Sequence, residues 1–384
     1  MIHWREATVE SVKGEWPGVR EVWARPSTPL PGTAGEQSSE AIAPIRAIAY
    51  ADLVGTPEEG DRVLLNVSAL ARGLGTGGFA LVVALPDRLP ADPPPADGHL
   101  VKDRYSPTQT MVLGVDDQES PHHHVLAEAR SIDGMPVVVA DLHSALPAVI
   151  AGLRTAAPEA RVSYVMTDGA ALALPFSRAV AGLVEAGWLH STFSVGQAWG
   201  GDHEAVTVHS ALLAARHVVE ADVVVVAQGP GNLGTGTPFG FSGMVVGDHL
   251  NAVAALGGEP VACLRMSDAD ARGRHYGISH HTLTAVGTGA LTPVHLPVPD
   301  FRDMPQKERL KCDRDPAMIS DLADEQVTEH LARHRRVDVS TVGLFEALTS
   351  SPVRLSTMGR GLTEDTPAFL AAAAAGPHAA TLLG

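Results

Sequence analysis

The sequence is poor in aromatic residues and in cysteine. Phe, Trp and Tyr make up 4% of the 384 residues, so the core has to rest on Val, Leu and Ala, which suits buried parallel strands. Two cysteines, Cys263 and Cys312, are too few for a disulfide framework, and a reducing compartment fits. Cys263 falls within an expected strand, where it is a small apolar residue and not a nucleophile.

Positive charge is also scarce. The formal net charge is −16, from 44 acidic and 28 basic residues. A nucleic-acid-binding protein needs a cationic face that displaces counterions. The sequence supplies no such face, so nucleic acid is not an expected partner.

Long hydrophobic runs are absent as well. No stretch reaches the roughly 18 apolar residues that a membrane-spanning helix needs, and residues 1–6 lack the basic start of a signal peptide. We therefore expect a cytoplasmic protein without a membrane partner. Apolar residues nevertheless make up 45% of the chain, which allows a sizeable core, and the length fits two ordinary domains.

Residues 1–86 alternate between short apolar segments and turns. This spacing is typical of a small barrel or a curled sheet, so we expect a small β-barrel-like N-terminal domain. Residues 87–99 contain Pro93, Pro94 and Pro95 and form a predicted Pro-rich linker, because proline lacks the N–H that helices and strands use. The expected strands cover residues 8–12, 19–23, 46–50, 62–66 and 79–83.

The pattern changes after the linker. Through residues 100–300, continuous apolar segments alternate with segments of helical periodicity. Such strands are buried on both faces, which predicts a doubly wound, mainly parallel sheet of the α/β (Rossmann-like) class. For residues 301–384 we expect a helical C-terminal extension. The expected strands are 110–115, 135–140, 161–166, 191–195, 222–227, 260–264 and 293–298, of which 222–227 is the clearest, and the expected helices are 146–154, 176–186, 204–220 and 244–256.

Every expected strand of this sheet leads into polar, Gly-rich or His-rich residues. Open parallel sheets bind ligands beyond the carboxyl ends of their strands, so we expect a site there for a small anionic or phosphorylated ligand. A histidine paired with a carboxylate would move protons. The candidate catalytic residues are Asp168, Asp202, His203, His275 and His280.

A Gly-rich segment at residues 229–243 lies between an expected strand and an expected helix. Glycines there let backbone N–H groups converge on an anion. The segment lacks the lysine of a phosphate loop, and its Gly-x-Gly-x-x-Gly spacing alone assigns no cofactor. A loop whose backbone packs closely on its neighbours is the alternative. The candidate ligand-binding residues are Ser177, Arg178, Gly229, Gly231, Asn232, Gly234, Thr235, Gly236, Arg274 and His281.

The sequence leaves metal binding open. No His-Glu-x-x-His or paired-cysteine motif occurs, and Asp202 and Ser279 are also good helix N-caps. Three adjacent histidines at 122–124 fit a solvated helix start or an adventitious metal site. The residues that would hold a divalent ion, if one binds, are Asp141, His143, Asp202 and His203.

Four longer motifs lie at residues 164–178, 200–206, 228–243 and 274–282, and include Gly200-Gly201-Asp202-His203-Glu204. Together they resemble an uncharacterised bacterial protein family, domain of unknown function 3866. The resemblance extends over nearly the whole chain. It implies no activity, ligand or catalytic residue, because the family has none assigned.

Three functions remain open from the sequence. The first is an enzyme acting on a small anionic or phosphorylated metabolite, the second a non-catalytic ligand-binding or scaffold protein, and the third a metal-dependent hydrolase. We expect a homodimer, since two-fold assemblies are the commonest oligomers. The expected pocket depends on the Gly-rich segment, the acidic-His segments and the histidines near 280 converging on a single rim of the sheet. The non-catalytic function instead predicts that the His and Asp side chains there are too far apart, or too buried, to act together.

Overall fold

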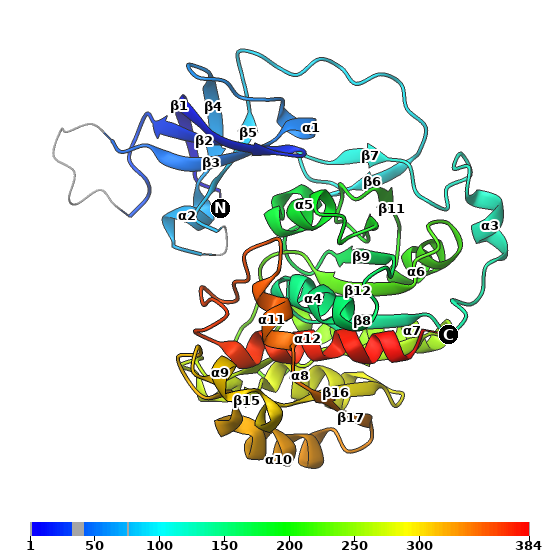
Figure 1. Ribbon diagram of the computed structural model, residues 1–384. Helices are drawn as coiled ribbons and strands as arrows, with labels where there is room; N and C mark the ends of the chain where they lie inside the picture. The colour runs from blue at the N-terminus through cyan, green and yellow to red at the C-terminus, as the bar shows by residue number, and fades with distance from the viewer. Residues whose placement is uncertain (1, 33–41, 75–76, 384) are drawn as a thin grey trace. The chain divides into compact units, whose positions relative to one another are not determined.

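The computed structural model describes residues 2–32, 42–74 and 77–383, which form two compact units (Figure 1). The first unit comprises Met1–Ala96 and Asp103–Thr110, and the second comprises Asp97–Lys102 and Met111–Gly384. Most of the Pro-rich segment therefore belongs to the first unit.

The first unit contains the β-barrel that the sequence predicts. Its strands close in the order β1-β2-β3-β5-β4. Alternate side chains face the interior, as the two-residue period of a strand requires, and Val63 and Leu65 of β4 are fully buried there. The elements are β1 Trp4–Trp16, β2 Val19–Pro26, β3 Ile45–Tyr50, α1 Ala51–Val54, β4 Arg62–Asn66, α2 Ser68–Ala71 and β5 Ala80–Ala84.

The second unit is built on an eight-stranded parallel sheet, which confirms the predicted α/β class. The strand order is β11-β10-β9-β12-β8-β13-β16-β17. Its central strands are buried along their whole length. The strands are β8 Pro136–Ala140, β9 Val162–Thr167, β10 Ser191–Ser194, β11 His203–Glu204, β12 Val223–Gln228, β13 Glu259–Ala262, β16 His295–Asp300 and β17 Arg335–Ser340, with β6 Leu100–Lys102 and β7 Thr110–Val112 as a separate pair.

Helices cover both faces of this sheet (Figure 1). The crossovers after β8 and β9 run toward β11 and place α4 and α5 on one face. The crossovers after β11 and β12 run the other way and place α6 and α7 on the opposite face, because such crossovers are right-handed. The helices are α3 His123–Glu128, α4 Leu146–Ala156, α5 Arg178–Glu185, α6 Val208–His217, α7 Val246–Ala255, α8 His280–Thr284, α9 Gln306–Arg309, α10 Ser320–His330, α11 Leu344–Thr349 and α12 Thr366–Thr381.

Three segments differ from the sequence prediction. The strand expected at 110–115 is the shorter β7, which pairs with β6 outside the eight-stranded sheet. Residues 203–204 form strand β11 where the sequence indicates the start of a helix, and α6 begins at Val208 because Thr207 and Ser210 form a capping box there. The expected helical extension over 301–384 contains β17, which adds an edge strand to the sheet. Charged residues precede and separate its two valines, so this strand has no continuous apolar run.

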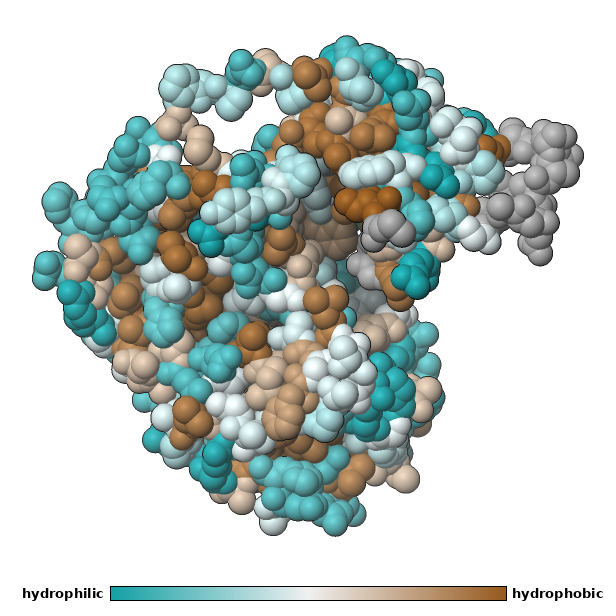
Figure 2. Space-filling view, turned by 180° about the vertical axis from the view of Figure 1, so that it is seen from behind, coloured by the Kyte–Doolittle hydropathy of each residue, from teal (hydrophilic) through white to brown (hydrophobic). Residues whose placement is uncertain are grey.

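The surface mixes residue types. In the view from behind, hydrophilic residues interleave with hydrophobic ones (Figure 2), and exposed apolar side chains include Leu291, Leu310 and Met318. Within the part of the chain that the structure describes, no helix combines the length and apolar character needed to cross a membrane.

Candidate functional site

A pocket opens at the carboxyl ends of β8 and β13. These strands are neighbours, but α4 follows β8 on one face, whereas the segment after β13 packs with α7 on the other. Such a divergence leaves a crevice at the strand ends, where α/β proteins bind ligands. Asp141 follows β8 directly and Arg265 follows β13 closely, and both line the pocket together with Ser267, His275 and Asp365.

A short hairpin returns a His-rich segment to the end of β13. The hairpin consists of β14 Met266–Ser267, the 3-10 turn Gly273–His275 and β15 Gly277–Ile278. At its base the Ser279 N–H donates a hydrogen bond of 2.8 Å to the Arg265 carbonyl oxygen. Ser279 is also the N-cap of α8, as the sequence predicts, and its Oγ accepts from the His281 N–H. The hairpin therefore places three histidines beside Arg265.

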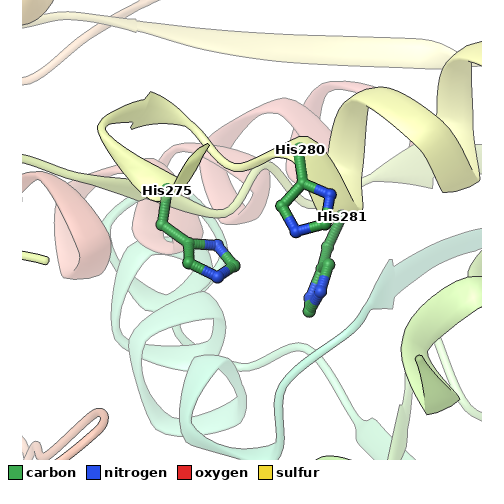
Figure 3. A group of neighbouring side chains, drawn as sticks. All are labelled: His275, His280 and His281. Atoms are coloured by element: carbon green, nitrogen blue, oxygen red, sulfur yellow. The ribbon is translucent and has the colours of Figure 1, made fainter. Parts of the chain in front are cut away.

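His275, His280 and His281 form a compact cluster, which we call the His trio (Figure 3). One nitrogen of each ring lies within 4.8 Å of one nitrogen of both other rings. The His275 Nδ1 makes a 2.7 Å hydrogen bond with Ser279 Oγ, so its Nε2 is the nitrogen left for a ligand. The His280 Nε2 is buried and has no hydrogen-bond partner among the described residues.

His281 is held from two sides. Its ring stacks on Phe241, with ring centroids 3.8 Å apart and an interplanar angle of 2°. Its Nδ1 lies 3.1 Å from Arg265 Nη1. The same Arg265 nitrogen lies 3.3 Å from Asp141 Oδ2, which in turn is 3.9 Å from His281 Nδ1. These contacts connect the end of β8 to the His trio.

The His trio is held in its neutral form. Burial lowers the pKa of His275 and of His281 to about 3, and the Arg265 charge adds to the effect. Burial lowers the pKa of His280 too, with Arg274 as the next cause. Neutral imidazoles offer the lone pairs that a transition-metal ion needs. A neutral imidazole has one lone pair, and that of His281 accepts from Arg265 Nη1, so the arrangement can bind a divalent metal ion once Arg265 moves off His281 Nδ1.

His143, which the sequence places in a candidate metal set, contacts other partners. Its Nδ1 lies 2.9 Å from the Tyr164 hydroxyl and its Nε2 lies 2.6 Å from Ser177 Oγ. Both ring nitrogens are thus engaged, and burial lowers its pKa to about 4. Ser177 is buried and also accepts the Val180 N–H as the N-cap of α5. The two His143 contacts therefore link the turn after β8 to β9, through Tyr164, and to the start of α5, through Ser177.

Asp202 and His203 lie at the far edge of the sheet. Their strand β11 is separated from β13 by β10, β9, β12 and β8, which corresponds to about 24 Å at the usual strand spacing. Asp202 Oδ2 accepts hydrogen bonds of 2.8 Å from the N–H and the hydroxyl of Thr192, and His203 stacks on Phe193. The structure therefore does not bring them to Asp141.

Asp168 follows β9 and is exposed. Its Oδ2 accepts a hydrogen bond of 2.8 Å from the Gln197 N–H. Between its strand and β13 lie β12 and β8. Of the candidate catalytic residues, the structure brings His275 and His280 together and places Asp168 elsewhere along the edge.

The Gly-rich loop approaches the His trio through Phe241. Several of its N–H groups are used within the loop: Thr235 N–H donates to the Gly240 carbonyl, and the N–H groups of Leu233 and Ser242 donate to each other's oxygens. At Gly229 a Cβ would lie 2.3 Å from the Ala171 carbonyl oxygen, so this glycine permits close backbone packing. The anion cradle of Gly229, Gly231, Asn232, Gly234, Thr235 and Gly236 stays a prediction.

Among the other candidate ligand residues, His281 and Arg274 belong to the hairpin region, while Arg178 is exposed at the start of α5. Arg265 and Phe241 were not among the residues proposed from the sequence. Arg265 could have been predicted as a site residue from its position just after an apolar strand. Phe241 could not have been predicted from the sequence, because its stacking on His281 depends on the fold.

A second group of three residues in the described chain could also hold a cation. His99, Asp117 and Glu119 bring their ligating atoms within 4.8 Å of one another. His99 and Glu119 are exposed, and His99 pairs with Asp117 at 3.0 Å. Exposed ligands hold a metal less firmly than a preorganised, partly buried set, so the His trio is the stronger candidate.

Two buried acids belong to the pocket region, one of which, Asp365, lines the pocket. Asp365 is fully buried, and its Oδ2 accepts hydrogen bonds from Ser267 Oγ at 2.8 Å and Arg360 Nε at 2.9 Å. Asp268 is 8% exposed, and one of its carboxylate oxygens has no partner among the described residues. Burial, followed by the charge of Asp365, raises the pKa of Asp268 to about 6.

Asp268→Asn is expected to change the pH dependence of stability. The pKa of Asp268 in the folded protein lies above the ordinary 3.8, so the folded state binds this proton more tightly than the unfolded state does. The stability contributed by this proton is complete at low pH and is lost as the pH rises through about 6. The difference between the two values corresponds to at most about 3 kcal/mol. In urea unfolding, the free energy of unfolding of Asp268→Asn minus that of the wild type should be about 1 kcal/mol higher at pH 8 than at pH 5. The control, Asp92→Asn at an exposed site, should differ in stability from the wild type by the same amount at both pH values. If the effect of Asp268→Asn on stability is also the same at both pH values, the raised pKa of Asp268 is wrong.

Comparison with known proteins identifies a family for the chain. The model of the family "Protein of unknown function (DUF3866)" matches residues 46–376. The chain belongs to this family. The match to the DUF3866 family includes the Gly-rich loop, the hairpin, the His trio and most of α12, but not β1 or β2 of the barrel. No curated protein and no solved structure is detectably similar to the chain.

Proposed function

We propose that this protein is a metal-dependent hydrolase in which His275, His280 and His281 hold a divalent ion such as Zn²⁺. The observation that carries the proposal is the convergence of three imidazole nitrogens within 4.8 Å. Three histidines are a sufficient protein ligand set for catalytic zinc, and they leave a further position for water. His275 also lines the pocket at the divergence of β8 and β13, which supports it further.

The surroundings of the trio fit a metal site. Ser279 Oγ fixes the His275 ring through Nδ1, as residues behind metal ligands do. A metal ion would also give a partner to the buried His280 Nε2, which has none among the described residues. An unpartnered buried ring nitrogen costs about 1–3 kcal/mol, so a ligand at this place would relieve an unfavourable feature of the fold.

Asp141 and Arg265 supply the remaining groups for hydrolysis. A bound divalent metal lowers the pKa of its water to about 7. The Asp141 carboxylate, whose Oδ2 lies 3.9 Å from His281 Nδ1, would be the nearby group that accepts a proton from water on such an ion. The Arg265 guanidinium, which contacts both Asp141 and His281, is placed to stabilise negative charge that develops on the substrate. The cytoplasmic location and the homodimer expected from the sequence belong to this proposal.

Zinc binding tests the proposal directly. Protein purified without metal should bind one Zn²⁺ per chain in isothermal titration calorimetry, and saturation at about 1,000 times the Kd should stabilise it by about 4 kcal/mol. His280→Ala should weaken zinc binding by about 100-fold or more, because it removes a direct ligand. The control replaces His122, His123 and His124 with Ala and should keep the tight site.

Two results would contradict the proposal. One is the absence of stoichiometric binding of Zn²⁺, Mn²⁺ and Co²⁺. The other is binding that survives His280→Ala and disappears in the triple control. Zinc binding without hydrolysis of any ester, amide or phosphate substrate would favour the non-catalytic alternative.

A further inference from the structure

The positive charge around the His trio is only partly neutralised. Arg265 pairs with Asp141 at 3.3 Å. Arg272 makes two hydrogen bonds to Asp270, of 2.9 Å and 2.8 Å. Each of these arginines therefore has its own carboxylate, and a substrate would have to compete with it.

Arg274 is different. It precedes His275 in the 3-10 turn of the hairpin, and its side chain is exposed. Among residues 2–32, 42–74 and 77–383, the structure gives Arg274 no hydrogen bond or ion pair. It is the chain neighbour of His275, which is buried in the trio, so its guanidinium extends from the same turn that supplies a trio member. Arg274 thus adds a positive charge at the trio without a matching carboxylate.

This charge is unusual for the molecule as a whole. The chain carries a net charge of −16, so its overall field repels anions. A divalent ion in the His trio would add two further positive charges beside Arg274. An anion would be drawn to this place and away from the rest of the surface.

The shape of the Arg274 guanidinium restricts the class of ligand further. A guanidinium presents parallel N–H donors that match two oxygens of a phosphate or a carboxylate. An exposed arginine can form such a pair without first breaking an internal one. We infer that the substrate carries a phosphate or carboxylate group and that Arg274 binds this group beside the His trio, an inference that rests on the proposed metal site.

Anion binding to the zinc-loaded protein tests the inference. Titration with inorganic phosphate and, separately, with acetate identifies which oxyanion is preferred. Arg274→Gln should weaken binding of the preferred anion by about 10- to 100-fold, the loss of one charged hydrogen-bonding group. Arg274→Lys keeps the charge but loses the paired donors, so its affinity should fall between those of the wild type and Arg274→Gln.

Arg130→Gln is the matched control. Arg130 is also exposed, but it precedes β8 and so lies at the opposite end of the strands. Its replacement should change anion affinity by less than about twofold. All variants should bind zinc as the wild type does, which shows that they are folded.

The outcomes separate this inference from the proposed function. Tight zinc binding with anion affinity unchanged in Arg274→Gln overturns the inference and leaves the metal site standing. Failure to bind zinc defeats the proposed function. In that case, anion affinity is measured on the metal-free protein. A lower affinity in Arg274→Gln supports the role of Arg274, and an unchanged affinity overturns it.

Discussion

Gly376→Ala is expected to destabilise the α/β unit by about 3 kcal/mol or more. Gly376 lies in α12 where this helix meets α4, and a Cβ at this position would fall 2.1 Å from the Leu153 backbone nitrogen and 2.5 Å from the Val149 carbonyl oxygen. Alanine favours a helix over glycine by about 1 kcal/mol. The clash outweighs this gain, because backbone atoms cannot rotate out of the way as a side chain can.

The same contact is built from both helices. A Cβ at Gly152 of α4 would lie 2.0 Å from the Ala373 carbonyl oxygen of α12. The run of alanines at 371–375 is buried here, so small residues on both helices allow a close approach. Because Phe369 and Ala372 of α12 also line the pocket, this packing positions one wall of the proposed active site.

Chemical denaturation followed by circular dichroism measures the effect of Gly376→Ala. Gly273→Ala serves as the control, since a Cβ there would meet no atom within 4 Å, and it should change stability by less than about 0.5 kcal/mol. Equal stability of Gly376→Ala and the wild type would mean that α12 packs on α4 less closely than described.

The fold class was predictable because its signals are local. Strands such as Val223–Gln228 are buried on both faces and therefore form continuous apolar runs. The barrel strands alternate and are separated by turns, which predicts their type without any knowledge of their partners. β17 was missed because it lacks a continuous apolar run, and its alternation rests on only two valines among charged residues.

The composition of the site was only partly predictable, because it depends on strand order. Nothing in the local sequence indicates that β12 inserts between β9 and β8 or that β13 lies on the other side of β8. This order brings Asp141 and Arg265 together although 124 residues separate them. It also leaves Asp202 and His203 at the opposite edge. His275, His280 and His281 were each singled out, but the two-residue strands of the hairpin that joins them are too short to be recognised from alternation.

A buried lysine was missed altogether, since lysine is almost never fully buried unless it is paired. The Lys102 Nζ of β6 donates to the carbonyl oxygens of Ser194, Ala198 and Ala205 at 3.3, 3.0 and 2.9 Å. These three acceptors match the three hydrogens of an ammonium group. The Glu204 carboxylate lies 3.4 Å away. Burial lowers the pKa of Lys102 and raises that of Glu204, so each depends on its partners to remain charged.

Lys102→Met is therefore expected to destabilise the α/β unit by about 3–5 kcal/mol, because it leaves a buried carboxylate and three carbonyl groups without their donor. The double variant Lys102→Met/Glu204→Gln should recover part of this loss, since it removes the uncompensated charge. The recovery is incomplete because the Ser194 hydroxyl and the Gly200 N–H donate to different oxygens of the Glu204 carboxylate, and an amide keeps only one of these two acceptors. Denaturant unfolding of both variants, with the exposed Lys307→Met as control, measures the coupling. If the double variant is no more stable than Lys102→Met alone, the carboxylate is not the source of the cost, and the three carbonyl groups must account for it.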